Sequence, residues 1–445
     1  MISHTRQSRK SVAFSLKASR NLQTQQPTLA QTHSESCSSD ASTDAEYHFL
    51  SHDYAPRLAH VRMGTPRQVA CYSRTGTNHF IYNENSSLRR FVPLTSGGEV
   101  RIPAIKFNGG QSKLPEIHRP KRVDQLLQAC LESEKGRIAL LKTDVVLPRN
   151  VLVKMIHGVG KFNVSYANGR LFFEEHEDEG KKLFQVTKLG MLAKYGFQFK
   201  YSYPYYYPKS RLNIPNGLND WSAVIERSIG GLNILMSGEV DCVKGAYSSN
   251  PDCYLDLHSR PFGSSSFPHL GKNHWKDLKD WFFRMYLMGI PELFLGLRNT
   301  GNNNTVVQTH FLHTEDIPNI VNSLEKYMNR PPWDPQDAVV RAFQTLYVLR
   351  DWVQETVDSL EAMPQKGKKK EDFVWRVEMR GKRENGLYVR ELSKGENERL
   401  WCVKENPSWK RDGEALPLPD WKKKYGIVNR ALIRKLRALD LGSMS

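Results

Sequence analysis

The chain has 445 residues, 39% of them hydrophobic and 10% aromatic, which is enough for a folded protein with a sizeable core. Lys and Arg outnumber Asp and Glu by 64 to 47, and the net charge of +17 favours RNA, DNA or an anionic membrane surface as partners, unless the protein is simply basic. Six cysteines without a C-x-x-C pair argue against a zinc module or a disulfide scaffold, and no apolar run is long enough for a membrane span.

The N-terminal region, residues 1–54, is rich in Ser, Thr and Gln and poor in large apolar residues, so it cannot supply a core. Its first 34 residues contain no acidic side chain but carry Arg6, Arg9, Lys10, Lys17 and Arg20. This composition fits an organelle transit peptide and also a disordered nucleic-acid-binding arm. We predict the disordered arm.

From residue 55 the composition turns globular, and the mixture of helix and strand patterns predicts one α+β domain over 55–430, followed by a C-terminal tail, 431–445. Helical spacing predicts helices at 123–134, 275–288 and 334–363. Alternation and turn signals predict a hairpin with turns at Gly169 and Gly180, and strands at 232–243, 253–259, 291–299, 306–313, 375–381, 387–392 and 399–406.

Two acidic alternations lie on the predicted strands 232–243 and 253–259. Residues i and i+2 of a strand share a face, so Glu239 and Asp241 are expected to project together. The same holds for Asp256 and His258 on the neighbouring strand. Converging carboxylates repel unless a cation lies between them, and Mg²⁺ or Mn²⁺ prefers oxygen ligands. The pattern fits a metal site that holds a phosphate, but it also fits an ordinary solvated strand face.

The sequence "GEVDC", followed by "YLDLH", resembles the paired E-x-D and E-x-K motifs of the DXO-type decapping and exoribonuclease family. Other matches follow in the family's order. "TPRQVACYS" with "LRRFVPL" resembles its opening, and Arg149 resembles its motif arginine. Tyr195–Lys200 resembles its G-Φ-x-Φ-E motif, where Φ is apolar, and "LKDWFFRMYLMGIPELFLGLRN" resembles its Gln-bearing helix and the next strand. The resemblance covers roughly residues 57–430.

This resemblance implies a mixed α+β fold with two twisted sheets around a cleft. Family members remove incomplete or non-canonical caps from RNA 5′ ends, and many degrade RNA 5′→3′ with two divalent metals. The implied metal ligands are the Glu of G-Φ-x-Φ-E, both acids of E-x-D and the Glu of E-x-K. The resemblance also implies Mg²⁺ or Mn²⁺ in an active member, and RNA 5′ ends and a 5′→3′ exoribonuclease as partners. With the basic N-terminal arm it indicates a nuclear location, and the lack of a long apolar run predicts no membrane partner.

Four residues keep the family pattern. Arg149, Glu239 and Asp241 match, and Asp256 keeps the charge of the expected Glu on a side chain one methylene shorter. Under this resemblance Glu239, Asp241 and Asp256 are the candidate metal ligands.

Three residues depart from the pattern: Lys200 replaces the expected Glu, His258 the expected Lys, and Arg284 the expected Gln. Lys200 would repel divalent cations or take the place of one beside the acids. A neutral His258 cannot supply the fixed charge of Lys, and Arg284 adds a fork that binds phosphate. Together the replacements predict that hydrolysis is lost or greatly reduced.

The predicted function is RNA 5′-end binding by Arg149, Lys200 and Arg284 on a decapping-nuclease fold, with a scaffolding or protective role in RNA processing. An active nuclease is the alternative, in which the three acids hold a metal and His258 acts as acid or base. A protein-interaction scaffold that no longer meets RNA is the third reading.

Overall fold

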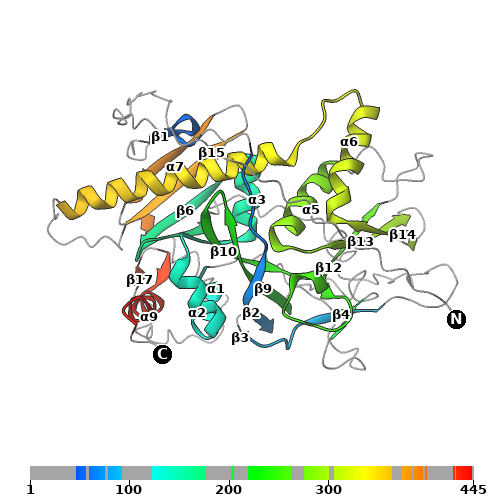
Figure 1. Cartoon of the computed structure of the whole chain (residues 1–445), viewed down its shortest axis with the longest axis horizontal. Coiled ribbons are helices and arrows are strands. Elements are labelled where there is room, and N and C mark those ends of the chain that lie inside the picture. Colours follow the sequence, from blue (N-terminus) through cyan, green and yellow to red (C-terminus); the bar gives the residue numbers. More distant parts are fainter. Residues whose placement is uncertain are drawn as a thin grey trace, which may run out of the picture. The chain divides into compact units, whose positions relative to one another are not determined.

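Two β-sheets and the helices packed on them form the described part of the chain. The computed structural model describes residues 47–56, 60–75, 79–92, 123–176, 202–204, 219–261, 275–299, 305–362, 373–381, 385–393, 396–397, 424–425 and 427–442. All of them belong to one folded unit, Thr43–Ser445 (Figure 1). None of the helices in these ranges is long and apolar enough to cross a lipid bilayer.

The larger sheet, sheet A, has ten strands among the described residues. Their spatial order is β1 (His48–Ser51), β16 (Gly386–Glu391), β15 (Val374–Arg380), β6 (Val159–Ala167), β7 (Arg170–Glu175), β5 (Val145–Pro148), β10 (Leu232–Glu239), β9 (Asp220–Ile229), β2 (Arg67–Thr75) and β3 (His79–Tyr82). Most neighbours are antiparallel, but β5 runs parallel to both β7 and β10.

The smaller sheet, sheet B, has six strands among the described residues. Their order is β14 (Thr305–His313), β13 (Glu292–Asn299), β12 (Tyr254–Pro261), β11 (Cys242–Val243), β4 (Arg89–Phe91) and β8 (Ser202–Pro204). A separate two-stranded ribbon consists of β17 (Lys424–Tyr425) and β18 (Val428–Asn429).

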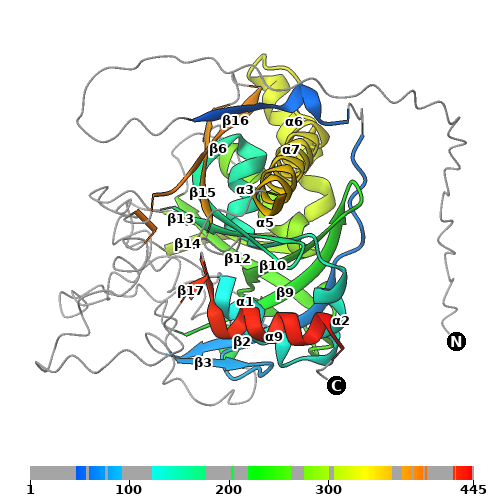
Figure 2. The same cartoon turned by 90° about the vertical axis from the view of Figure 1, so that its left-hand side faces the viewer.

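Helices cover both faces of sheet A (Figure 2). The helices are α1 (Val123–Leu131), α2 (Glu134–Lys142), α3 (Arg149–His157), α5 (Trp275–Met288), α6 (Ile317–Tyr327), α7 (Pro335–Ala362) and α9 (Arg430–Asp440), and short 3₁₀ turns are η1 (His52–Tyr54), η3 (Pro251–Cys253) and η4 (Thr314–Asp316). Helices α3, α5 and α7 pack on one face, and α1, α2 and α9 on the other.

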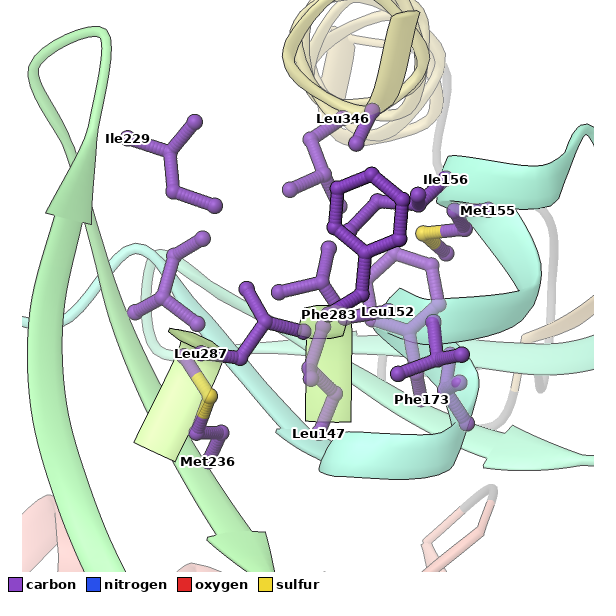
Figure 3. Packing of buried hydrophobic residues seen from close by; sticks show 14 of the residues in the cluster. Leu147, Leu152, Met155, Ile156, Phe173, Ile229, Met236, Phe283, Leu287 and Leu346 are labelled. Carbon is purple, nitrogen blue, oxygen red and sulfur yellow. The ribbon is translucent and has the colours of Figure 1, made fainter. Parts of the chain in front are cut away.

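Strand alternation divides the buried residues between these two layers. Leu147 and Met236 point toward Leu152 of α3 and Phe283 of α5 (Figure 3), whereas Leu235 belongs to the cluster under α1 and α9. Full burial of a Leu or Phe side chain stabilises the fold by about 1.5–3 kcal/mol relative to exposure. Central strands that are buried on both faces therefore have nearly continuous apolar sequences.

Most predicted elements are present. Helices α1, α5 and α7 and strands β13, β14, β15 and β16 lie where the sequence predicts them, and the first turn of the predicted hairpin falls at Gly169 between β6 and β7. The α+β fold with two sheets is confirmed. The predicted turn at Gly180 and the strand 399–406 lie outside the described residues.

Both predicted ends of the domain need correction. Residues 48–51, which fall within the predicted arm, form β1 and pair with β16. The predicted tail, 431–445, contains most of α9, whose side chain cap is Asn429. Four residues of α9 are buried in the second core cluster, namely Leu432, Ile433, Leu436 and Leu439. Their helical spacing makes an apolar face, and α9 packs against α1, α2 and the β17–β18 ribbon.

Candidate functional site

The two acids of the first motif stand at the point where the chain passes from one sheet to the other. Glu239 is the last residue of β10 in sheet A, and Asp241 directly precedes β11 in sheet B. Between them Val240 is buried and donates its N–H to the Trp221 carbonyl at 3.1 Å. The prediction that both acids lie on one continuous strand is therefore wrong, because the strand ends at Glu239.

Asp241 and Asp256 come together on sheet B. The pairing of β11 with β12 places them side by side, and they are 7% and 6% exposed. Asp241 Oδ2 accepts the Leu257 N–H at 2.8 Å, and the two carboxyl groups lie within hydrogen-bonding reach of each other. Two carboxyl groups this close must share a proton or a cation, so the pair is suited to hold a positive ligand.

His258 is fixed by its neighbours on two sides. Its Nε2 lies 3.1 Å from Asp256 Oδ2, and its ring stacks on Trp281 of α5 with centroids 4.5 Å apart and planes 12° apart. Burial alone would raise the pKa of Asp256, but His258, Asp241 and Arg149 hold that pKa well below its usual range. Asp256 is therefore a carboxylate, and one of its oxygens faces the histidine.

Arg149 brings a buried positive charge to these acids. It is the first residue of α3, directly after Pro148, and is 8% exposed. Burial and the nearby Arg284 lower the pKa of Arg149, whereas Asp256, Glu239 and Asp241 raise it. The guanidinium thus lies among the acids, with Arg284 beside it.

Gly238 leaves space for the Arg149 side chain, but the N–H groups of Arg149 are only partly hydrogen-bonded. A Cβ added at Gly238 would lie 3.2 Å from Arg149 Cδ, so a side chain at position 238 would crowd the arginine. Arg149 Nη1 donates to the Arg284 carbonyl at 3.4 Å. Its buried Nε has no hydrogen-bond partner in the described part of the chain. This N–H is an unsatisfied buried donor.

Arg284 is held between α5 and α3. Its Nε donates to Asp280 Oδ2 at 2.6 Å, and its Nη1 donates to Asn150 Oδ1 at 3.0 Å. Asp280 also lies 3.4 Å from His157 Nε2. Burial alone would raise the pKa of Asp280, but His157 and Arg284 lower it to about 2. Arg284 therefore has structural partners, and its side chain is still 32% exposed.

Sequence reasoning did not assign Arg89 to the site. Burial lowers its pKa to about 10, and Asp241 and Cys242 oppose that effect, which places its guanidinium near Asp241. Arg89 belongs to the motif "LRRFVPL", which resembles the family's opening, and it begins β4. Sequence alone could not show that β4 lies beside β11.

The role of Lys200 and the identity of the metal ligands stay predictions. Lys200 lies outside the described residues. Among the residues that are described, no three Asp, Glu, His or Cys side chains are arranged as ligands of one metal ion. The Asp241–Asp256 pair is chemically suited to a hard divalent cation. Glu239 is the third acid near Arg149 and would complete the predicted ligand set.

Comparison with known proteins identifies the family. Residues 64–406 match the RAI1-like PD-(D/E)XK nuclease family. The chain belongs to this family. The predicted resemblance is thereby confirmed, and Asp256-Leu257-His258 has the acidic residue of a (D/E)-x-K signature with His in place of Lys.

Curated relatives include decapping nucleases of yeasts. The chain is 20% identical over 334 residues to the decapping nuclease RAI1 of Candida albicans, covering 66% of this chain and 82% of that one. It is 25% identical over 293 residues to the decapping nuclease RAI1 of Yarrowia lipolytica, covering 59% and 78%. The family is therefore one of decapping nucleases, at low sequence identity to this chain.

Solved structures show the same fold. A crystal structure of Candida albicans Rai1 in complex with pU5–Mn²⁺ has a TM-score of 0.62 at 16% identity and covers 88% of this chain and 99% of that one. A structure of S. pombe Rai1 in complex with 3′-FADP has a TM-score of 0.56 at 17% identity and covers 78% and 100%.

Proposed function

We propose that this chain binds RNA 5′ ends and that its hydrolytic activity is lost or much weakened. The observation that carries the proposal is the pairing of Asp256 with His258 at 3.1 Å. In the family pattern the first of these positions is a metal ligand and the second a lysine. Here the carboxylate is directed at the side chain that replaces the lysine, and Trp281 fixes that side chain by stacking.

The pair Arg149 and Arg284 supports phosphate binding. Their guanidinium groups are close enough that Arg284 lowers the pKa of Arg149, and Arg149 Nε has no partner in the described part of the chain. Two neighbouring cations in a partly desolvated place repel each other unless an anion joins them. A terminal phosphate with several acceptor oxygens fits between such groups.

The structures of relatives support an RNA ligand. The Candida albicans protein was solved with pU5 and Mn²⁺, and the S. pombe protein with 3′-FADP. Both compounds carry phosphate groups on a nucleoside. We propose the same class of ligand, RNA with a 5′ phosphate, for the cations of this chain.

A weak nuclease is the second candidate, favoured by the contact between Asp241 and Asp256. With Glu239 these acids would hold Mg²⁺ or Mn²⁺, and the metal would supply Lewis-acid activation of a phosphate. His258 would then be the acid or base, since its ring faces Asp256. The replacement of Glu by Lys200 opposes this function, because a lysine ammonium repels the metal.

Binding to three RNAs that differ only at the 5′ end tests the proposal. We expect 5′-triphosphate RNA to bind more tightly than 5′-monophosphate RNA, and 5′-hydroxyl RNA to bind most weakly. Charge reversal by Arg284→Glu together with Lys200→Glu should remove this order. The exposed Arg434 on α9 gives a control, Arg434→Glu, which should keep it. If the chain binds no RNA, the scaffold reading is favoured and the proposal is wrong.

The protein partner is proposed from the family resemblance, and the location from that resemblance and the basic N-terminal arm. We propose a 5′→3′ exoribonuclease as a protein partner and the nucleus as the compartment. Co-purification and fluorescence localisation would check the two points separately.

A further inference from the structure

A group of aromatic rings and arginines lies at the β1 edge of sheet A, apart from the candidate site. We call it the edge platform, and its members are Tyr47, Phe49, Tyr388, Arg380 and Arg390. Strand register places them on one face, because Phe49 pairs with Tyr388. Arg380 follows two residues after Glu378, which is the register partner of Tyr388 on β15.

The opposite face of the same strands is core. Leu50, Leu387 and Val389 are buried with residues of α7. Figure 2 shows α7 on one side of β15 and β16. The platform residues alternate with these apolar residues and therefore project away from α7. An outward strand face usually carries solvated polar side chains, whereas this face carries three aromatic rings.

The rings and guanidinium groups form a connected surface. The centroids of Phe49 and Tyr388 are 5.2 Å apart, and those of Tyr47 and Tyr388 are 6.4 Å apart. The Arg380 guanidinium lies 3.8 Å from the Tyr388 centroid, and that of Arg390 lies 5.5 Å from the Tyr47 centroid. Phe49 is 45% exposed. The aromatic faces and cations together have the composition that single-stranded nucleic acid contacts use.

The charges on this face are positive in balance. Arg390 donates two hydrogen bonds to Glu396, at 2.9 and 2.6 Å, which fix it in place beside Tyr47. Glu378 lies 3.6 Å from Arg380 and 3.9 Å from Lys161, so among the described residues the cations Arg380, Arg390 and Lys161 face the two acids Glu378 and Glu396. The excess charge favours a polyanion over a neutral or basic partner.

We propose that the edge platform is a second contact for single-stranded RNA, which stacks bases on the rings while its phosphates meet Arg380 and Lys161. This inference rests on the proposed function, since it places the RNA body downstream of the bound 5′ end. Four strand spacings of about 4.8 Å separate β15 from β10, or about 19 Å. A stacked strand rises about 3.4 Å per nucleotide, so the RNA needs at least about six nucleotides to reach both places.

RNAs of two lengths distinguish binding at the edge platform from binding at the 5′-end site. We would measure fluorescence anisotropy with 4-nucleotide and 20-nucleotide RNAs, each with a 5′-phosphate or a 5′-hydroxyl. Phe49→Ala should weaken the 20-mer about tenfold and leave the 4-mer unchanged, because loss of one stacked base costs about 1–3 kcal/mol. Arg380→Gln should lower the salt slope for the 20-mer by about 0.7, the effect of one lost phosphate contact.

A matched control comes from Tyr54 in η1, an exposed aromatic residue outside the platform. Tyr54 is 62% exposed, so Tyr54→Ala should not change RNA binding. Photo-crosslinking of the unaltered chain with 4-thiouridine RNA provides a test that needs no variant. Crosslinks should fall on Phe49 or Tyr388.

The inference is overturned if Phe49→Ala and Arg380→Gln bind the 20-mer like the unaltered chain, or if crosslinks fall on other strands. A platform that serves a protein partner gives that same result. Failure of the proposed function looks different. In that case the 5′-phosphate would have no effect on either RNA length, while the platform variants would still weaken the 20-mer.

Discussion

The acids Glu239, Asp241 and Asp256 lie between two groups of side chains, one from the sheet A side and one from the sheet B side. These two sides differ in how many residues match the family motifs. The sheet A side, from β10 and α3, supplies Glu239 and Arg149, which match the family motifs. The sheet B side, from β12 and α5, supplies His258 and Arg284 where the motifs have Lys and Gln. Asp241 lies at the crossing between the sheets.

The replaced side is also the side on which each side chain has several partners. His258 contacts Asp256 and Trp281, and Arg284 contacts Asp280 and Asn150. On the kept side Arg149 Nε is without a partner in the described part of the chain. His258 and Arg284 therefore each have partners of their own, whereas the retained Arg149 keeps one unsatisfied N–H among the described residues.

The largest effect is expected from Arg149→Met on the kept side. This change removes a buried cation that neighbours Asp256, Glu239 and Asp241, and removing one member of a buried charge cluster costs about 3–5 kcal/mol. Urea unfolding should show this loss, whereas Arg434→Met on the exposed face of α9 should change stability by less than about 0.5 kcal/mol. A loss below about 1 kcal/mol for Arg149→Met would mean that the acids do not depend on it.

The next largest effect is expected on the replaced side, in the coupling between Asp256 and His258. A double-mutant cycle of Asp256→Asn and His258→Ala measures it. We expect a coupling free energy of about 1–2 kcal/mol, because the two side chains are in contact. Chemical unfolding of the four proteins measures it. The cycle of Asp256→Asn with Arg434→Gln serves as control and should be additive within about 0.5 kcal/mol. Additivity in the first cycle would contradict the pairing.

Restoring the family residue at position 200 should strengthen metal binding. Lys200→Glu replaces a repelling cation with the acid of the family motif. We expect Mn²⁺ affinity to rise about tenfold, or roughly 1.4 kcal/mol, measured by titration calorimetry. Lys435→Glu on exposed α9 should have no such effect. Equal gains in both variants would show a general charge effect and no specific site.

The smallest effect is a pH dependence at Asp280. Its pKa is lowered to about 2 by His157 and Arg284 against the opposing effect of burial. The carboxylate therefore stabilises the fold above about pH 4, and the contribution is lost as the pH falls toward 2. Because its side chain is 35% exposed, we expect at most about 1 kcal/mol. The stability difference between the unaltered chain and Asp280→Asn should shrink below pH 4, and a constant difference would contradict this.

Much of the fold follows from local pattern. Leu278, Trp281 and Met285 make a stripe at helical spacing, and all three are buried in α5. The errors at both ends have a different cause. Residues 48–51 are a strand only because β16 lies beside them, and this pairing joins positions far apart in the sequence. The amphipathic face of α9 is apparent from the helical spacing of Leu432, Leu436 and Leu439, so this helix could be predicted from the sequence.

The site was predictable in its members but less so in its geometry. Motif order identified Arg149 and the acids that surround it. No local pattern could show that the strand ends at Glu239 or that His258 stacks on Trp281, because these depend on how sheet B and α5 pack.

The central claim is that the 5′-end site binds without efficient cleavage. The most direct measurement is Mn²⁺-dependent hydrolysis of 5′-triphosphate RNA by the unaltered chain beside Asp241→Asn, with binding followed in the same samples. We predict that 5′-phosphate-dependent binding is present and that turnover does not exceed that of Asp241→Asn. Turnover that Asp241→Asn abolishes would contradict the claim and establish an active nuclease.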